Sequence, residues 1–174
     1  QTLQAEFRQE IVDVDQKLVE AASGRVSLMK PGRFRWDYLE PFERVIVANG
    51  TRVWLYEADL EQVTIRTLDA ALGETPAALL SGNPEVLERF EYVDGNVTDN
   101  SLRVDLRPNS LESDFDLIRL VFERDQLTEL TLRDRLGQTT RIELLDVELN
   151  EALDADTFVF EVPEGADVIG ETEL

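Results

Sequence analysis

Residues 33–57 read RFRWDYLEPFERVIVANGTRVWLYE, and apolar side chains alternate with polar ones along much of this stretch. Phe34, Trp36 and Tyr38 lie two residues apart, the period that places side chains on one face of a β-strand. Asn49-Gly50 separates the runs RVIVA and TRVWLYE, and an Asn-Gly pair accepts the positive φ angles of a type I′ turn. The stretch therefore predicts three successive antiparallel strands, with a hairpin between the last two.

The alternation extends along most of the chain. Further strands are predicted at VSLMK, EQVTIRT, EYV, LRVDLR, FDLIRLVFE, LTELTLR, RIELLDVEL and TFVFEVP, with turns at Asp94-Gly95-Asn96 and near Leu136-Gly137. We count about nine or ten strands joined by short turns, without the rhythm of a βαβ protein. This pattern predicts an antiparallel meander.

Three segments interrupt the pattern and are predicted to be helical. At residues 1–8, QTLQAEFR, Leu3 and Phe7 have the spacing of neighbours on one helical face. Residues 75–82 begin with Thr-Pro and end with Gly, as a capped helix does, and a second short helix is predicted over 83–90. Helices this short can cover one opening or concavity of a sheet, but they cannot form an outer layer.

A single sheet of this extent twists strongly, so it must split into a sandwich, close into a barrel, or curl and be covered. The residues alone leave these three architectures open. At roughly 150 residues per domain, we expect residues 1–174 to form one domain.

Composition excludes several classes of function. The chain has 17 Lys and Arg against 37 Asp and Glu, so its net charge is −20, and it contains no His and no Cys. This charge repels nucleic acids and anionic membrane surfaces. Without His or Cys there is no Ser-His-Asp triad, no Cys nucleophile and no imidazole or thiolate zinc site. We therefore expect no nucleic-acid partner, no cofactor, no metal and no catalytic residues.

The many carboxylates leave two chemical alternatives. A pair of acids facing an apolar concavity would permit a carboxylate-dependent hydrolase. Asp94-Gly95-Asn96, with Asp99 and Asn100, brings together oxygen atoms of the kind that bind calcium. The strand pattern places most acids on the polar face, and turns favour Asp, Gly and Asn for backbone reasons alone. We therefore expect solvated acids and an ordinary turn.

Large apolar residues are the remaining candidates for function. Phe34, Trp36, Trp54, Tyr56 and the pair Leu79-Leu80 either form the core of the sheet or line a cavity for an apolar ligand. Periodicity does not separate these interpretations, and composition alone favours the core.

Several stretches spread over the chain form a recognisable pattern. They are AEFRQ (5–9), KPGRFRW (30–36), EP (40–41), VANGT (47–51), VWLY (53–56), TPAALL (75–80), DTFVF (156–160) and VPEGADV (162–168). In order and spacing they resemble the LolA family of periplasmic carriers of outer-membrane lipoproteins. The resemblance covers essentially the whole chain.

The resemblance implies a mainly β (α+β) fold: a curled antiparallel sheet that forms an incomplete β-barrel, with a short helical lid over an apolar concavity. It favours the cavity over the packed core. The positions that it implies for contact with acyl chains are Phe34, Trp36, Trp54, Tyr56, Leu79 and Leu80.

The function that the resemblance implies is transport without catalysis. A monomeric carrier in the periplasm would accept lipoproteins from an inner-membrane ABC transporter of the LolCDE type. It would shield their acyl chains and pass them to an outer-membrane acceptor of the LolB type.

One position departs from the family pattern. A basic residue, usually Arg, precedes the Pro of this motif in the family and ties the barrel to the lid, whereas this chain has Lys30. Lysine keeps the charge but lacks the planar fork of donors of Arg. Lys30 is therefore either a weaker latch to the lid or a solvated cation.

Two related roles remain as alternatives to the carrier, namely a LolB-like acceptor and a periplasmic lipid sensor. An acceptor would carry a lipidated N-terminal Cys, which this chain lacks. Gln1 is not a translation start, so we expect the chain to be a processed or trimmed product.

Overall fold

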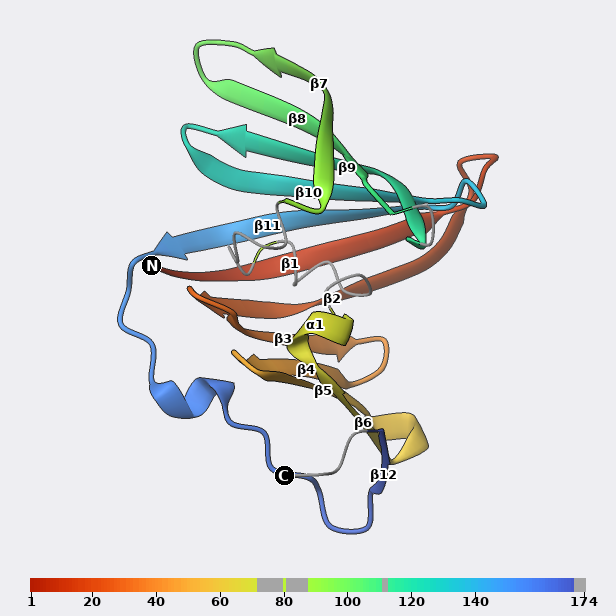
Figure 1. Cartoon of the computed structure of the whole chain (residues 1–174), viewed down its shortest axis with the longest axis vertical. Helices are drawn as coiled ribbons and strands as arrows, with labels where there is room; N and C mark the ends of the chain where they lie inside the picture. The colour runs from red at the N-terminus through yellow and green to blue at the C-terminus, as the bar shows by residue number, and fades with distance from the viewer. Residues whose placement is uncertain (72–79, 81–87, 111–112, 171–174) are drawn as a thin grey trace.

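The computed structural model describes residues 1–71, 80, 88–110 and 113–170. These residues form one sheet of 12 strands with three short helical turns (Figure 1). The strands are β1 (Thr2–Val12), β2 (Leu18–Met29), β3 (Arg33–Glu40), β4 (Arg44–Asn49), β5 (Arg52–Glu57), β6 (Gln62–Thr67), β7 (Phe90–Val97), β8 (Ser101–Pro108), β9 (Phe115–Glu123), β10 (Gln126–Asp134), β11 (Thr139–Leu149) and β12 (Asp167–Gly170). The helical turns are η1 (Ala58–Leu60), α1 (Leu68–Ala71) and η2 (Ala155–Phe158).

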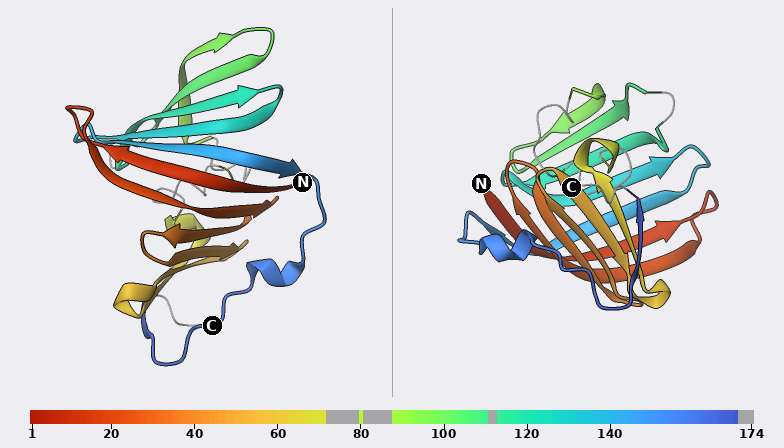
Figure 2. Two further views of the ribbon diagram at one scale, coloured as in Figure 1. Left: turned by 180° about the vertical axis from the view of Figure 1, so that it is seen from behind. Right: turned by 60° about the horizontal axis from the view of Figure 1, so that its bottom comes forward.

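The sheet is open and curled, as predicted. Its order is β12-β6-β5-β4-β3-β2-β1-β11-β10-β9-β8-β7. β1 and β11 are far apart in the sequence, but they pair with each other in the middle of the sheet. Neighbouring strands are antiparallel except β12 and β6, which are parallel. The curl gives the sheet a concave face, on which α1 lies, and a convex face (Figure 2).

The predicted helix at residues 1–8 is wrong, because residues 2–8 belong to β1. Leu3 and Phe7 share a face in a strand as well as in a helix, since their separation is an even number of residues. Ala5 between them is also buried, which only the two-residue period explains. β1 pairs with both β2 and β11, so the first residues of the chain hold the middle of the sheet together.

Two other local predictions are wrong. The Asp94-Gly95-Asn96 segment continues β7, and the chain reverses just after it, where the Thr98 amide donates to the Ser101 carbonyl. TFVFEVP begins in η2 and continues outside the strands. The predicted helices over 75–82 and 83–90 lie outside the described residues, apart from Leu80 and the three residues 88–90.

The predicted hairpin of β4 and β5 is confirmed, but its turn differs in type. The two residues between the strands are Gly50-Thr51, of which only Gly50 has a positive φ, 102°. Glycine at the first central position is the type II′ pattern. Both residues of the β9–β10 turn, Arg124-Asp125, have positive φ (51° and 64°), the pattern of type I′.

The concave face carries the main apolar core. At its centre, the Phe7 ring lies 5.0 Å from the rings of both Trp36 and Tyr38, measured between centroids. Gly24 makes room for this cluster, because a Cβ there would overlap the Asp37 carbonyl oxygen and come within 2.9 Å of the Phe7 ring. α1 packs onto the same core through Leu68 and Ala71.

The convex face is covered differently in its two halves. Over β3 to β6, the segment after β11 packs on the sheet, burying Phe158 together with Val47 and Val63. Over β7 to β11, the face is charged and ion-paired. Arg119 donates to both oxygens of the buried Asp105, at 2.7 and 2.8 Å.

Asp105→Asn is expected to lower the free energy of unfolding by about 1–3 kcal/mol at pH 7. The hydrogen bonds from Arg119 lower the pKa of the Asp105 carboxyl. A carboxyl group of this kind stabilises the fold above its unfolded pKa, about 3.9, and the contribution is lost as pH falls through the lower folded value. The difference between the variant and the parent should therefore shrink toward pH 2 or so.

Urea unfolding at several pH values tests this expectation. Asp116→Asn is the matched control, because Asp116 also accepts two hydrogen bonds from one arginine, Arg133, but both side chains are over 40% exposed. Its loss should stay below about 1 kcal/mol. Equal losses in the two variants would show that burial of Asp105 contributes nothing.

Candidate functional site

A hollow of about 300 Å³, which we call the main hollow, opens on the concave side at the strand ends near the N-terminus. Its apolar lining consists of Leu3, Leu28, Leu80, Leu120, Phe122, Leu127 and Leu149. Its polar lining consists of Gln1, Thr2, Lys30, Asp125, Gln126 and Asn150. The main hollow therefore joins an apolar interior to a hydrophilic rim.

Strand register brings the apolar lining together. Leu3 of β1 lies opposite Leu28 of β2 on one side and Leu149 of β11 on the other. Leu127 of β10 lies opposite Phe122 of β9. Partners of this kind share one face of the sheet, so residues far apart in the sequence form a continuous apolar surface.

A second hollow, of about 270 Å³, lies on the concave face of β4 to β6 beside α1, and we call it the inner hollow. Its apolar lining is Ile46, Val53, Leu55 and Ala71. Arg66, Glu57 and Thr64 complete its lining.

Phe34 and Trp36 lie on the concave face and are almost completely buried, with 0% and 1% of their surface exposed. Neither lines the two hollows described above. The indole nitrogen Nε1 of Trp36 has no hydrogen-bond partner among the described residues. Leu80 is half-buried and lines the main hollow, and Leu79 lies outside the described residues.

Trp54 and Tyr56 lie on the convex face, opposite the hollows. Their neighbours in the strand, Val53 and Leu55, line the inner hollow. Alternate residues of a strand point to opposite faces, so Trp54 and Tyr56 point away from that hollow. The Tyr56 ring instead contacts Phe160, with 6.0 Å between centroids. Tyr56 thus belongs to the packing between the sheet and the segment that follows β11.

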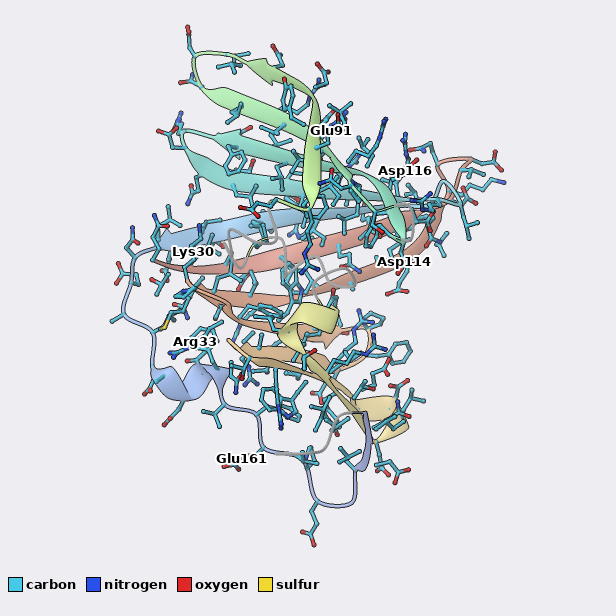
Figure 3. All side chains as sticks on the ribbon, in the orientation of Figure 1. Lys30, Arg33, Glu91, Asp114, Asp116 and Glu161 are labelled. Atoms are coloured by element: carbon cyan, nitrogen blue, oxygen red, sulfur yellow. The ribbon has the colours of Figure 1, made fainter. Side chains whose placement is uncertain are left out.

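Lys30 lies at the rim of the main hollow, on the side of the sheet where the chain begins (Figure 3). Its backbone amide donates to the Gln1 carbonyl at 2.9 Å. Its side chain is exposed and has no hydrogen bond or ion pair with any residue that the structure describes. Among the described residues, Lys30 therefore presents an unpaired ammonium group at the rim of the hollow that Leu80 also lines.

Buried acidic residues are rare in the described ranges. Asp105 is the one acidic residue that is buried within the described ranges, and it lies on the convex face with Arg119. In the same part of the chain, no three acidic residues are grouped closely enough to hold a metal ion. None of the described helices has the length and apolar character needed to cross a membrane.

Comparison with known proteins identifies the family. The model of the family described as "Outer membrane lipoprotein carrier protein LolA" matches residues 1–161. This chain belongs to the LolA family. The LolA-family protein of Pseudomonas aeruginosa strain PAO1, named outer-membrane lipoprotein carrier protein, is 43% identical over 175 residues, covering 98% of this chain and 82% of the relative. The protein of the same name in Dechloromonas aromatica is 38% identical over 170 residues, with the same two coverages.

Solved structures show the same fold at low identity. A LolA superfamily protein from Nitrosomonas europaea aligns with a TM-score of 0.52 at 11% identity, covering 91% of this chain and 90% of that one. An uncharacterized conserved protein from Thermus thermophilus aligns with a TM-score of 0.56 at 15% identity, covering 97% and 89%. The open curled sheet is thus shared well beyond recognisable sequence similarity.

Most of the main hollow of this LolA-family chain was not among the predicted site residues. Leu120 and Phe122 carried a signal, because with Ile118 they alternate with more polar neighbours in β9. Leu3 carries an ambiguous signal, because its four-residue spacing from Phe7 also fits a helix. Nothing in the sequence indicates that β1, β2, β9, β10 and β11 meet around one hollow.

Proposed function

We propose that this chain carries lipoproteins by holding their acyl chains against the concave apolar face. The observation that supports this role most directly is the main hollow, lined by seven apolar side chains at one end of the central strands. Burying acyl chains stabilises the complex by roughly 0.8 kcal/mol per methylene, so water-exposed chains would bind such a surface strongly. The names of the relatives support lipoproteins as the source of those chains.

The proposed carrier works in the periplasm as a monomer. It accepts cargo from a transporter of the LolCDE type and delivers it to an acceptor of the LolB type. It does so as a binding protein, without catalysis. The described strands form an open sheet whose end strands, β12 and β7, do not pair with each other. Cargo therefore enters and leaves without breaking the hydrogen bonds between strands.

Four of the predicted site residues keep proposed roles on the concave side. Leu80 contacts acyl chains in the main hollow. Phe34 and Trp36 form the apolar floor farther along the same face. Lys30, at the rim of the main hollow, is the proposed latch, with its ammonium group donating to carbonyl oxygens of the proposed lid.

Two assays on the full chain test the proposal. The protein is titrated with a fluorescent fatty acid, and it is incubated with vesicles that contain the LolCDE-type transporter and a lipoprotein. We expect saturable binding of the fatty acid and release of the lipoprotein into the supernatant as a complex with the carrier. A folded sample that does neither would exclude the carrier role.

A further inference from the structure

An apolar row leads out of the main hollow toward the free edge of the sheet. Leu127 lies opposite Phe122, Phe122 opposite Leu102, and Leu102 opposite Val97. Exposure rises along the row, from 8% at Leu127 to 38% at Leu102 and 75% at Val97. The concave apolar surface therefore does not end at the hollow, but emerges onto β7.

A third hollow, of about 370 Å³, lies on this path, and we call it the edge hollow. It is lined by residues 97–102 with Phe122, Arg124 and Asp125, of which Phe122 and Asp125 also line the main hollow. The hairpin tips of β7–β8 and β9–β10 that form it lie on the side where the chain begins (Figure 1). Unlike the main hollow, it is lined mostly by groups that form hydrogen bonds, and these groups suit a polypeptide better than an acyl chain.

β7 is a free edge strand. It pairs with β8 on one side, and the described part of the chain places no strand on its other side. Its side chains are mostly exposed, among them Tyr92 at 62% and Val93 at 42%. The free edge of such a strand presents backbone donors and acceptors that an extended peptide satisfies by adding to the sheet.

Building on the proposed function, we propose that the polypeptide following the acylated residue of a bound lipoprotein leaves the main hollow across Phe122 and Leu102. It then pairs as an extended strand with the free edge of β7. Acyl chains and polypeptide diverge from one residue of the cargo, so the polypeptide must start at the rim of the main hollow. The edge hollow adjoins that rim and leads to β7.

The opposite edge of the sheet fits this cargo segment less well. β12 has 4 residues against 8 in β7, and it stands at the other end of the strand order. Neither the main hollow nor the edge hollow contains a residue of β12. The geometry therefore assigns the polypeptide to β7 alone.

Val93 provides a specific test of backbone pairing. It lies at an irregularity between Tyr92 and Asp94 and has no partner residue in β8, so proline there preserves the β7–β8 register while removing a donor. We expect Val93→Pro to weaken lipoprotein binding about tenfold relative to Val93→Ala, the loss expected for one or two hydrogen bonds. Binding of a fluorescent fatty acid should be the same in both variants.

Disulfide trapping gives an independent measurement, because the chain contains no cysteine of its own. Val97→Cys should cross-link to a lipoprotein with a single added cysteine within about ten residues of its acylated end, the reach of a strand along β7. Ile169→Cys on β12, which is half-exposed, is the control and should remain unlinked.

The outcomes separate the two proposals. Equal lipoprotein affinity in Val93→Pro and Val93→Ala, together with equal cross-linking at the two edges, would overturn pairing with β7 while fatty-acid binding persists. Loss of fatty-acid binding in the parent chain would instead overturn the carrier function.

Discussion

Leu120→Asn is expected to weaken binding of a fluorescent fatty acid about ten- to a hundredfold. Leu120 lines the main hollow from the middle of β9. An amide there would contact methylene groups and lose its hydrogen bonds to water when the ligand enters, which costs about 1–3 kcal/mol. The chain itself should fold, since Leu120 is only half-buried without ligand. Fluorescence titration gives the dissociation constant.

Val121→Asn is the matched control for Leu120→Asn. Val121 is the next residue of the same strand, is also half-buried, and faces the convex side. Its replacement should change the dissociation constant by less than a factor of about two, an effect within about 0.5 kcal/mol. If both variants weaken binding equally, the ligand does not occupy the main hollow.

Phe7→Ala is expected to lower the free energy of unfolding by about 3–5 kcal/mol. Phe7 is 1% exposed and contacts both Trp36 and Tyr38, so truncation removes two ring contacts and leaves a cavity. β1 also lies between β2 and β11, so the cavity would lie where the two halves of the sheet join. Urea unfolding monitored by tryptophan fluorescence measures the loss.

Phe42→Ala provides the comparison for this second expectation. Phe42 is 68% exposed in the loop between β3 and β4. Removing its ring should change stability by no more than about 0.5 kcal/mol. If Phe7→Ala were as mild as Phe42→Ala, β1 would not be a central strand of the folded protein.

The curled sheet was predictable because alternation persists through many strands and the resemblance to LolA favours a curl over a sandwich. The N-terminal strand was not predicted, since Leu3 and Phe7 satisfy two periods at once. The burial of Ala5 and Gln9 distinguishes the strand period from the helical one, and neither an alanine nor a glutamine gives much signal of burial in a sequence. β12 was also missed, because its 4 residues pair with β6 across a large separation in sequence.

The candidate site was harder to predict because β5 is apolar on both faces. In VWLY, Trp54 and Tyr56 look like the natural ligand contacts because they are the largest residues. The structure places both on the convex face, where Tyr56 contacts Phe160, which is about a hundred residues away in sequence. The sequence of β5 alone therefore does not tell which of its two apolar faces lies on the concave side, because the other face packs against a segment distant in sequence. Periodicity also does not reveal where packed side chains leave a hollow, as they do around Leu120.

The open edges of the sheet have a consequence for the size of the binding space. In a closed barrel, strand number and shear fix the radius. Among the described strands, β7 and β12 are the two ends of the order, so these strands form no closed ring of hydrogen bonds that would set the internal width. That width follows from twist and side-chain packing, which can adjust while every pair of neighbouring strands remains bonded. The volume enclosed by a sheet of this kind can therefore change with the size of the ligand it holds.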